Sequence, residues 1–228
     1  MITLYSGTPG SGKSLKTAER IYNIMKYQCK LIIANFDCNV SKFKKSRSKF
    51  IYRDNSQINP SWLQDTAGEW YKSHKFSEDG VILIIDECQL MFNARDWNKS
   101  GRGSWLSFFT LHRHIGINII LVAQFDRMID RQIRSLIEYE YIHRKVSNFG
   151  WKGKIVSMFV LGKMFVQVQM WYPLREKVGV EFFVAKKAYY SMYDTYALFD
   201  EQAKNKKTKS VIPNPGPEPE DQANNKVG

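Results

Sequence analysis

The chain has 228 residues and a mass of 26.7 kDa, and 43% of its residues are hydrophobic. This length allows one α/β domain with a large core and leaves too little room for two full domains. Three cysteines without a C-x-x-C spacing argue against a disulfide framework or a zinc ribbon. The formal net charge of +12 favours nucleic acid, anionic lipid or acidic protein as a partner, without choosing among them.

A glycine-rich segment directly follows the short apolar run 2–5 and fits the pattern G-x-x-x-x-G-K-[ST] at every fixed position. It comprises Gly7, Thr8, Pro9, Gly10, Ser11, Gly12, Lys13 and Ser14. Such a loop wraps backbone N–H groups around phosphate oxygens, and glycine is needed wherever a Cβ would block the approach. Lys13 is expected to reach the β- and γ-phosphates, and the Ser14 hydroxyl to bind Mg²⁺. Apolar residues then recur at helical spacing, so the segment predicts nucleoside triphosphate at a helix N-terminus.

The next predicted elements flank a basic connection. A short strand at 31–34 precedes an edge strand at 50–52, and a helix follows with Asn59 as N-cap and Pro60 at its first position. Six basic residues lie in or beside the connection between the two strands: Lys42, Lys44, Lys45, Arg47, Lys49 and Arg53. A solvated loop and a partner-binding surface account for this charge equally well.

A second apolar run, 81–85, contains only isoleucine, leucine and valine and is bounded by Gly80. We expect it to form a parallel strand covered on both faces. Two carboxylates follow at its end. Asp86 is expected to organise Mg²⁺ together with Ser14, and Glu87 to act as the base that polarises water for attack on the γ-phosphate. A helix cap or a solvated strand end is the alternative, which the nearby P-loop pattern disfavours.

A polar segment, 90–103, precedes a predicted helix for which Ser104 is the expected N-cap. A further buried strand, 117–123, ends next to Gln124. Ligands of α/β sheets bind outside the carboxyl ends of parallel strands. Gln124 is therefore predicted to sense the γ-phosphate, with a simple strand cap as the alternative.

The pattern then changes from alternating strands and helices to successive strands. A short helix is expected at 130–137, followed by a β-rich extension over 137–185. Within this extension, Gly162-Lys163 separates two strand-like runs, 155–161 and 164–171, and suits a type II′ hairpin.

The last residues, 204–228, are basic at first and then rich in proline and acidic residues, so we expect them to be disordered. We therefore expect residues 1–203 to form one P-loop NTPase domain of the α/β class, with a mainly parallel sheet flanked by helices. No run reaches the length of a membrane-spanning helix, and no signal peptide fits the first residues. These patterns predict a cytosolic protein.

Several segments together resemble the zonular occludens toxin (Zot) family, whose N-terminal domain is also the assembly ATPase of filamentous phages, similar to the gene I protein. The resemblance covers about residues 1–144. It rests on the loop 7–14, Ile85-Asp86-Glu87, the segment 112–116 that leads to Gln124, Ile129-Asp130 and Ile133-Arg134. The tyrosine-containing segment 189–195 is similar to one that often closes this domain. The Arg-His-x-Gly part of 112–116 gives most of the family specificity, because many NTPases share the other motifs.

The resemblance implies an ATP-driven machine that packages and extrudes phage particles at the host inner membrane. The implied partners are phage coat or assembly proteins, single-stranded DNA, and the cytoplasmic face of that membrane. The better-known branch of the family continues into a membrane-spanning helix and an extracytoplasmic portion, to which the toxin activity is attributed. We find neither pattern here, so we expect peripheral membrane contact and make no toxin assignment.

Ring-forming P-loop motors take a transition-state cation from an arginine of the next subunit. Arg113 is the first candidate, with Arg95 and Arg102 after it, and a surface or phosphate-contacting arginine is the alternative for each. This role predicts a homo-oligomer, in the form of a ring.

Two other functions stay open. One is a DNA-translocating or packaging ATPase of the hexameric pump type, which would share the P-loop, the carboxylates and the basic surface. The other is a nucleotide-gated adaptor that binds membrane or coat protein and hydrolyses ATP slowly or not at all.

Overall fold

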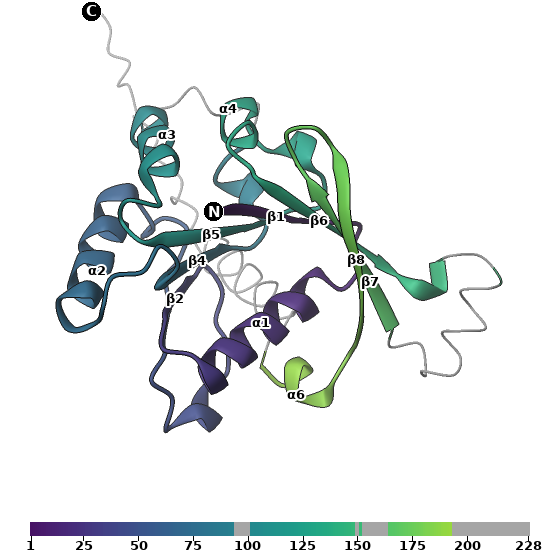
Figure 1. Ribbon diagram of the computed structural model, residues 1–228, viewed down its shortest axis with the longest axis horizontal. Helices are drawn as coiled ribbons and strands as arrows, with labels where there is room; N and C mark the ends of the chain where they lie inside the picture. Colours follow the sequence, from purple (N-terminus) through teal and green to yellow (C-terminus); the bar gives the residue numbers. More distant parts are fainter. Residues whose placement is uncertain (94–100, 149–150, 152–163, 193–228) are drawn as a thin grey trace, which may run out of the picture. The chain divides into compact units, whose positions relative to one another are not determined.

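The computed structural model describes residues 1–93, 101–148, 151 and 164–192, and one eight-stranded sheet organises them (Figure 1). In spatial order its strands are β3 (Lys49–Tyr52), β2 (Leu31–Ala34), β4 (Val81–Ile85), β5 (Ile117–Val122), β1 (Ile2–Ser6), β6 (Tyr139–Lys145), β7 (Met164–Trp171) and β8 (Glu176–Val184). The first six are paired in parallel, and β7 and β8 extend the sheet in antiparallel pairing. The predicted α/β class with a mainly parallel sheet is confirmed.

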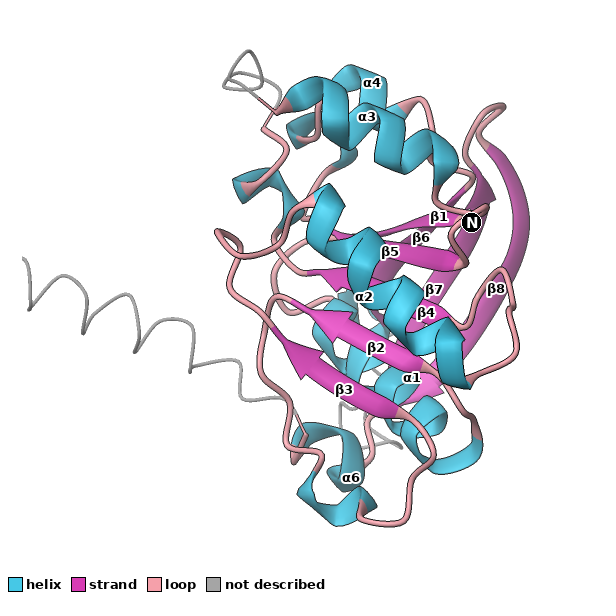
Figure 2. Ribbon diagram, turned by 90° about the vertical axis from the view of Figure 1, so that its left-hand side faces the viewer, coloured by secondary structure: helices cyan, strands magenta, loops and turns pink. Residues whose placement is uncertain are grey.

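Helices cover both faces of the parallel strands, as Figure 2 shows with α2 in front of the sheet and α1 behind it. On one face α1 (Lys13–Tyr27) packs Ile21 and Ile24 into a cluster with Ile82. On the other, α2 (Pro60–Ser73) and α3 (Arg102–Leu111) pack Leu63 and Phe109 against Leu83. Short helices complete the connections: η1 (Ser41–Phe43), η2 (Cys88–Leu90), η3 (Asp126–Met128), α4 (Arg131–Arg134), η4 (Val146–Asn148) and α6 (Lys187–Tyr190).

The burial of strand β4 on both faces explains why its sequence does not alternate between polar and apolar residues. All of its residues are buried, with Leu83 and Ile85 in the cluster under α2 and Ile82 and Ile84 in the cluster under α1. Successive side chains of a strand point to opposite faces, so a strand covered on both sides is apolar throughout.

Helix boundaries agree with the prediction at α2 and differ at α3. The Asn59 side chain accepts a hydrogen bond from the backbone N–H of Trp62 (3.0 Å), which confirms the predicted N-cap. Helix α3 instead begins at Arg102, with Gly101 as N-cap at φ 111°. The Ser104 hydroxyl donates to the Gly101 carbonyl inside the first turn (2.7 Å), so the predicted cap at Ser104 is wrong. A glycine at positive φ lets the chain enter the helix earlier.

Strand β6 is the second difference. The prediction places it in the antiparallel extension, yet it pairs in parallel with β1, with Thr3 opposite Tyr139, and only its other edge pairs antiparallel with β7. The extension predicted over 137–185 therefore begins inside the parallel sheet. The helix expected at 130–137 is also shorter than predicted. It spans Arg131–Arg134 as α4, with Ser135 as its C-cap.

Several predictions fall on residues outside the described ranges. They concern the strand 155–161, the Gly162-Lys163 link, Arg95, the boundary at 203 and the tail 204–228. None of the helices in the described part of the chain has both the length and the apolar character needed to cross a membrane.

The imidazole of His143 on β6 lies in the core between the sheet and α1. It is 1% exposed, its Nδ1 lies 3.3 Å from the Ser6 carbonyl oxygen, and its ring centroid is 5.0 Å from that of Tyr5. Burial penalises the charged form and lowers the pKa of His143 from 6.5 to about 4. The folded protein therefore holds this ring neutral.

Phe109→Ala tests the core under α3. Phe109 is 1% exposed and packs against Phe92 and Trp105, so we expect its truncation to lower the free energy of unfolding by about 3 to 5 kcal/mol. Denaturant titration measures the loss. Phe76→Ala, at a side chain that is 52% exposed, is the control and should cost about 1 kcal/mol or less.

The pH dependence of stability tests His143. The unfolded chain binds a proton at this ring near pH 6.5, and the folded protein only near pH 4. Stability from this group is thus fully present above pH 6.5 and is lost as the pH falls toward 4, by up to about 3 kcal/mol. We expect His143→Gln to flatten the fall of unfolding free energy across this range, relative to wild type and to the exposed-site control His114→Gln. Equal slopes in all three proteins would contradict the assignment.

Candidate nucleotide-binding and hydrolysis site

The loop between β1 and α1 has a backbone that only glycine fits at two positions. Gly7 and Gly12 have φ values of 141° and 98°, which L side chains rarely adopt. A Cβ on Gly7 would lie 2.5 Å from the His143 carbonyl oxygen, and one on Gly12 would lie 2.7 Å from the Phe165 ring. Helix α1 begins immediately afterwards at Lys13. Its first amides therefore border the loop, as anion binding requires.

The side chain of Lys13 folds back over this loop. Its Nζ donates to the carbonyl oxygens of Gly7 (2.7 Å) and Thr8 (3.3 Å), and the residue is 8% exposed. Burial lowers the pKa of Lys13, and the negative charges of Glu87 and Asp86 act in the opposite direction. The two carboxylates after β4 therefore lie within electrostatic range of the P-loop lysine.

Asp86 is held in place by an asparagine from the next strand along the sheet. The Asn35 side chain accepts from the Asp86 backbone N–H (2.7 Å) and donates to the Asp86 carbonyl (2.8 Å). Asp86 is 9% exposed, and its Oδ1 accepts from the backbone N–H of Glu87 (2.9 Å). This arrangement fixes the carboxylate at the carboxyl end of β4.

Glu87 itself occupies an uncommon backbone conformation. Its φ is 46°, in the left-handed region that non-glycine residues rarely adopt, and its carboxylate accepts a hydrogen bond from Gln89 Nε2. Strain of this kind persists where the surrounding structure enforces it, and it concentrates at functional sites.

Gln124 is brought directly to the loop. The backbone N–H of Gly7 donates to its carbonyl oxygen (3.1 Å), and the preceding N–H of Ala123 donates to Tyr5 (3.0 Å). These bonds continue the β1–β5 pairing past the ends of both strands, so the sensor predicted after β5 lies beside the first glycine of the P-loop.

The donor set at this edge of the sheet fits Mg²⁺. Ser14, in the first turn of α1, supplies a hydroxyl, and Asp86 supplies a carboxylate. Hard oxygen ligands of this kind, few in number, suit an ion that keeps waters and binds nucleotide phosphates. Bound Mg²⁺ would supply charge neutralisation at the phosphate oxygens.

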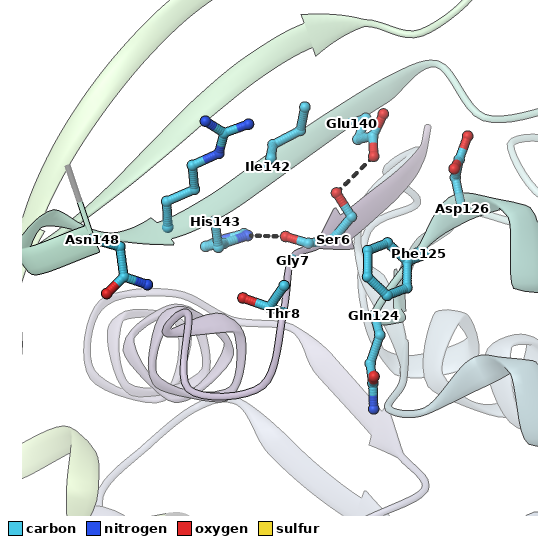
Figure 3. Close-up of a pocket in the computed structure, with 11 residues that line it drawn as sticks. Ser6, Gly7, Thr8, Gln124, Phe125, Asp126, Glu140, Ile142, His143 and Asn148 are labelled. Atoms are coloured by element: carbon cyan, nitrogen blue, oxygen red, sulfur yellow. Dashed lines mark hydrogen bonds between the residues drawn. The ribbon is translucent and has the colours of Figure 1, made fainter. Parts of the chain in front are cut away.

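A cavity of about 530 Å³ adjoins the start of the loop (Figure 3). Its volume is within the range of small-molecule sites. Its walls come from β1 and the loop, the segment after β5, and β6 with η4, and are formed by Ser6, Gly7, Thr8, Gln124, Phe125, Asp126, Glu140, Ile142, His143, Arg144 and Asn148.

Three residues of the cavity wall, Ser6, Glu140 and Asp126, form a polar network with Arg175, hereafter the loop network. The Ser6 hydroxyl donates to Glu140 (2.6 Å), and Arg175 donates from Nη1 to the other Glu140 oxygen (2.6 Å) and from Nη2 to Asp126. Arg175 lies in the β7–β8 turn at φ 57°. The network thus joins the last residue of β1, the segment just after Gln124, and the antiparallel hairpin.

Arg113 lies at the other end of the strands. Its guanidinium pairs with Glu138, whose carboxylate also accepts from the backbone N–H of Ile2 at the start of β1 (3.2 Å). The P-loop follows the opposite end of that strand, after Ser6. The structure therefore does not bring Arg113 to the nucleotide site of its own subunit, and its action across an interface stays a prediction.

Arg102 is likewise engaged elsewhere. Its guanidinium lies 3.8 Å from Asp130 and donates from Nε to Gln132 (3.2 Å), at the start of α4.

Sequence reasoning missed Asn35, Glu140 and Arg175. Asn35 directly follows a buried strand, so the rule that selected Gln124 could have selected it as well. Glu140 is 4% exposed, and a carboxylate inside a strand is a signal in itself. Arg175 lies in a turn more than thirty residues after Glu140, and no local pattern connects the two.

The chain is similar to known proteins. A model of the family described as zonular occludens toxin (Zot) matches residues 1–198. Gene 1 protein of Enterobacteria phage M13 is 27% identical over 168 residues, which are 70% of this chain and 47% of that protein. Gene 1 protein of Enterobacteria phage I2-2 is 23% identical over 205 residues, or 87% of this chain and 56% of that protein. The chain thus spans about half the length of the curated relatives it matches.

Solved structures show the same fold. The N-terminal domain of zonular occludens toxin from Neisseria meningitidis superposes with a TM-score of 0.53 at 20% identity, covering 85% of this chain and 98% of that one. B204, the DNA-packaging ATPase from Sulfolobus Turreted Icosahedral Virus, superposes with a TM-score of 0.52 at 17% identity, covering 79% of this chain and 95% of that one. The fold is that of P-loop ATPases, and the family match over 1–198 shows that the chain belongs to the zonular occludens toxin (Zot) family.

Proposed function

We propose that this protein binds ATP with Mg²⁺ and hydrolyses it to drive the assembly and export of filamentous phage particles. The observation that carries the proposal is the convergence of the P-loop, Asp86-Glu87 and Gln124 at the carboxyl ends of β1, β4 and β5. Membership of the Zot family and similarity to phage gene 1 proteins support the biological process.

Each residue has a distinct role in this proposal. The amides of residues 7–14 hold the phosphates, and Lys13 neutralises charge on the β- and γ-phosphates. Ser14 and Asp86 hold Mg²⁺. Glu87 orients the attacking water and accepts its proton, and Gln124 responds to the γ-phosphate.

The proposed assembly is a homo-oligomeric ring at the cytoplasmic face of the host inner membrane, working with phage coat or assembly proteins. Arg113 is half exposed at the edge away from its own P-loop, and in this proposal it serves a neighbouring subunit. Mixing Arg113→Ala with Glu87→Gln subunits tests this role, since each subunit supplies what the other lacks. Mixed oligomers without activity argue against it.

A DNA-translocating or packaging ATPase is the second candidate, favoured by the net charge of +12 and by the shared fold of B204. Strong stimulation of hydrolysis by single-stranded DNA, with salt-sensitive binding, would support it. ATP binding without turnover in the presence of any partner would instead support a nucleotide-gated adaptor.

Lys13→Ala and Glu87→Gln separate binding from hydrolysis. We expect Lys13→Ala to abolish tight ATP binding, because the buried ammonium group is lost. Glu87→Gln should bind ATP normally and slow turnover about 100-fold or more. Calorimetry and phosphate release measure the two effects. Normal turnover in Glu87→Gln would remove that residue from the mechanism.

Complementation links this chemistry to the process. A phage lacking the gene should release particles when supplied with the wild-type chain and none with Lys13→Ala. Normal release with Lys13→Ala would refute ATP-driven export.

Arg175→Ala tests the loop network. Without the guanidinium, the carboxylates of Asp126 and Glu140 lose the cation between them, and the segment after Gln124 loses its anchor. We expect kcat to fall about tenfold with KM nearly unchanged. Burial raises the pKa of Glu140 and Arg175 opposes this, so the loss should grow as the pH falls. Arg175→Lys should rescue little, since one ammonium does not replace a two-pronged contact. Arg127→Ala, which replaces an exposed arginine, is the control.

A further inference from the structure

A basic hollow lies at the end of α1 that is remote from the P-loop. Its volume is about 430 Å³, and it is formed by the last turn of α1 and the segment around η1. Four of the residues that line it are lysines: Lys26, Lys42, Lys44 and Lys45. Ser41 and Ser46 add hydroxyl groups, and none of its described lining residues is acidic.

Aromatic rings rather than carboxylates contact two of these lysines, Lys42 and Lys26. The ammonium group of Lys42 lies 5.2 Å from the ring centroid of Tyr22 and 5.6 Å from that of Phe43, and it donates to the Ala188 carbonyl (3.1 Å). Lys26 lies 5.0 Å from the ring of Tyr27. Cation–π contacts position an ammonium group without cancelling its charge.

Four lysines without a carboxylate partner in the described part of the chain gather at this one hollow. Lys16, Lys30 and Lys72 each form an ion pair with a carboxylate. The four lysines of the hollow form none with any described residue. The hollow therefore concentrates uncompensated positive charge, which favours a polyanion.

We propose that this hollow is a binding surface for the backbone of single-stranded nucleic acid. Phosphates would lie against the lysines and the serine hydroxyls, and a base would stack on Tyr27, which is 66% exposed and whose ring contacts the lining residue Lys26. An anionic membrane fits less well. The apolar residues that line the hollow are Met25, which is 5% exposed, and Phe43, which is half-buried, whereas surface binding to a bilayer needs apolar groups that insert.

Helix α1 connects this surface to the nucleotide site. It runs for 15 residues from Lys13 to Tyr27, a length of roughly 22 Å. Both ligands can therefore bind at once, at opposite ends of one rigid element. Binding to the hollow is independent of the proposed ATP hydrolysis, and only its coupling to turnover rests on that function.

The test is the salt dependence of binding to a labelled oligothymidylate of about 16 nucleotides, followed by fluorescence anisotropy with the full chain. We expect Lys44→Gln/Lys45→Gln to weaken binding about tenfold and to reduce the slope of log K against log salt by about 1.4, for two lost phosphate contacts. Tyr27→Leu should weaken binding about fivefold or more through lost stacking. Lys72→Gln, an exposed lysine on α2, is the matched control and should change affinity less than about twofold.

Unchanged affinity and slope in Lys44→Gln/Lys45→Gln would overturn the proposal. It would also be overturned if that variant lost binding to phosphatidylglycerol vesicles while keeping oligonucleotide binding, since the surface would then serve a membrane. As a control for folding, the variant and the wild type should have equal midpoints of thermal unfolding. Lys13→Ala should still bind the oligonucleotide. This separates the two ideas, because absence of ATP hydrolysis by the wild-type chain would defeat the ATPase proposal and leave the hollow standing.

Discussion

The parallel pairing of β1 with β5 is the constraint on which the site depends. Their register continues past the strand ends through the hydrogen bond from Gly7 to Gln124. Because β4 is the next strand along, Asp86 and Glu87 emerge at the same edge. Side chains that are far apart in the sequence thus meet because parallel strands all end on one side. The glycines of the loop then allow the backbone to turn tightly into α1.

The Asn35 side chain and one polar network tie that edge together. Asn35 fixes Asp86 from the β2 side, and the loop network fixes Ser6 from the β7–β8 side. The antiparallel hairpin is therefore more than an appendage to the sheet. Through Arg175 it contacts Asp126 in the segment that follows Gln124, so the positions of the hairpin and of that segment are linked.

Local patterns predicted the P-loop, the α2 cap and the strands at 81–85 and 117–123, because each depends on residues close in sequence, and the second strand ends one residue earlier in the structure. One of the errors is local and another depends on tertiary pairing. Ser104 is a good cap by composition, yet Gly101 starts α3 because its backbone adopts positive φ. The direction of β6 depends on which edge of β1 is free, and no alternation of its own residues encodes that.

The P-loop pattern, the two carboxylates and the glutamine at strand ends can be recognised in the sequence alone, since those motifs are local and chemically specific. Which charges lie close together follows from the fold. It placed Arg113 with Glu138, away from the loop, and Arg175 against Asp126, two residues after Gln124. It also joined Lys26 of α1 to the lysines around η1 in one hollow. Contacts between distant residues follow from strand order and packing, and a linear pattern does not contain that order.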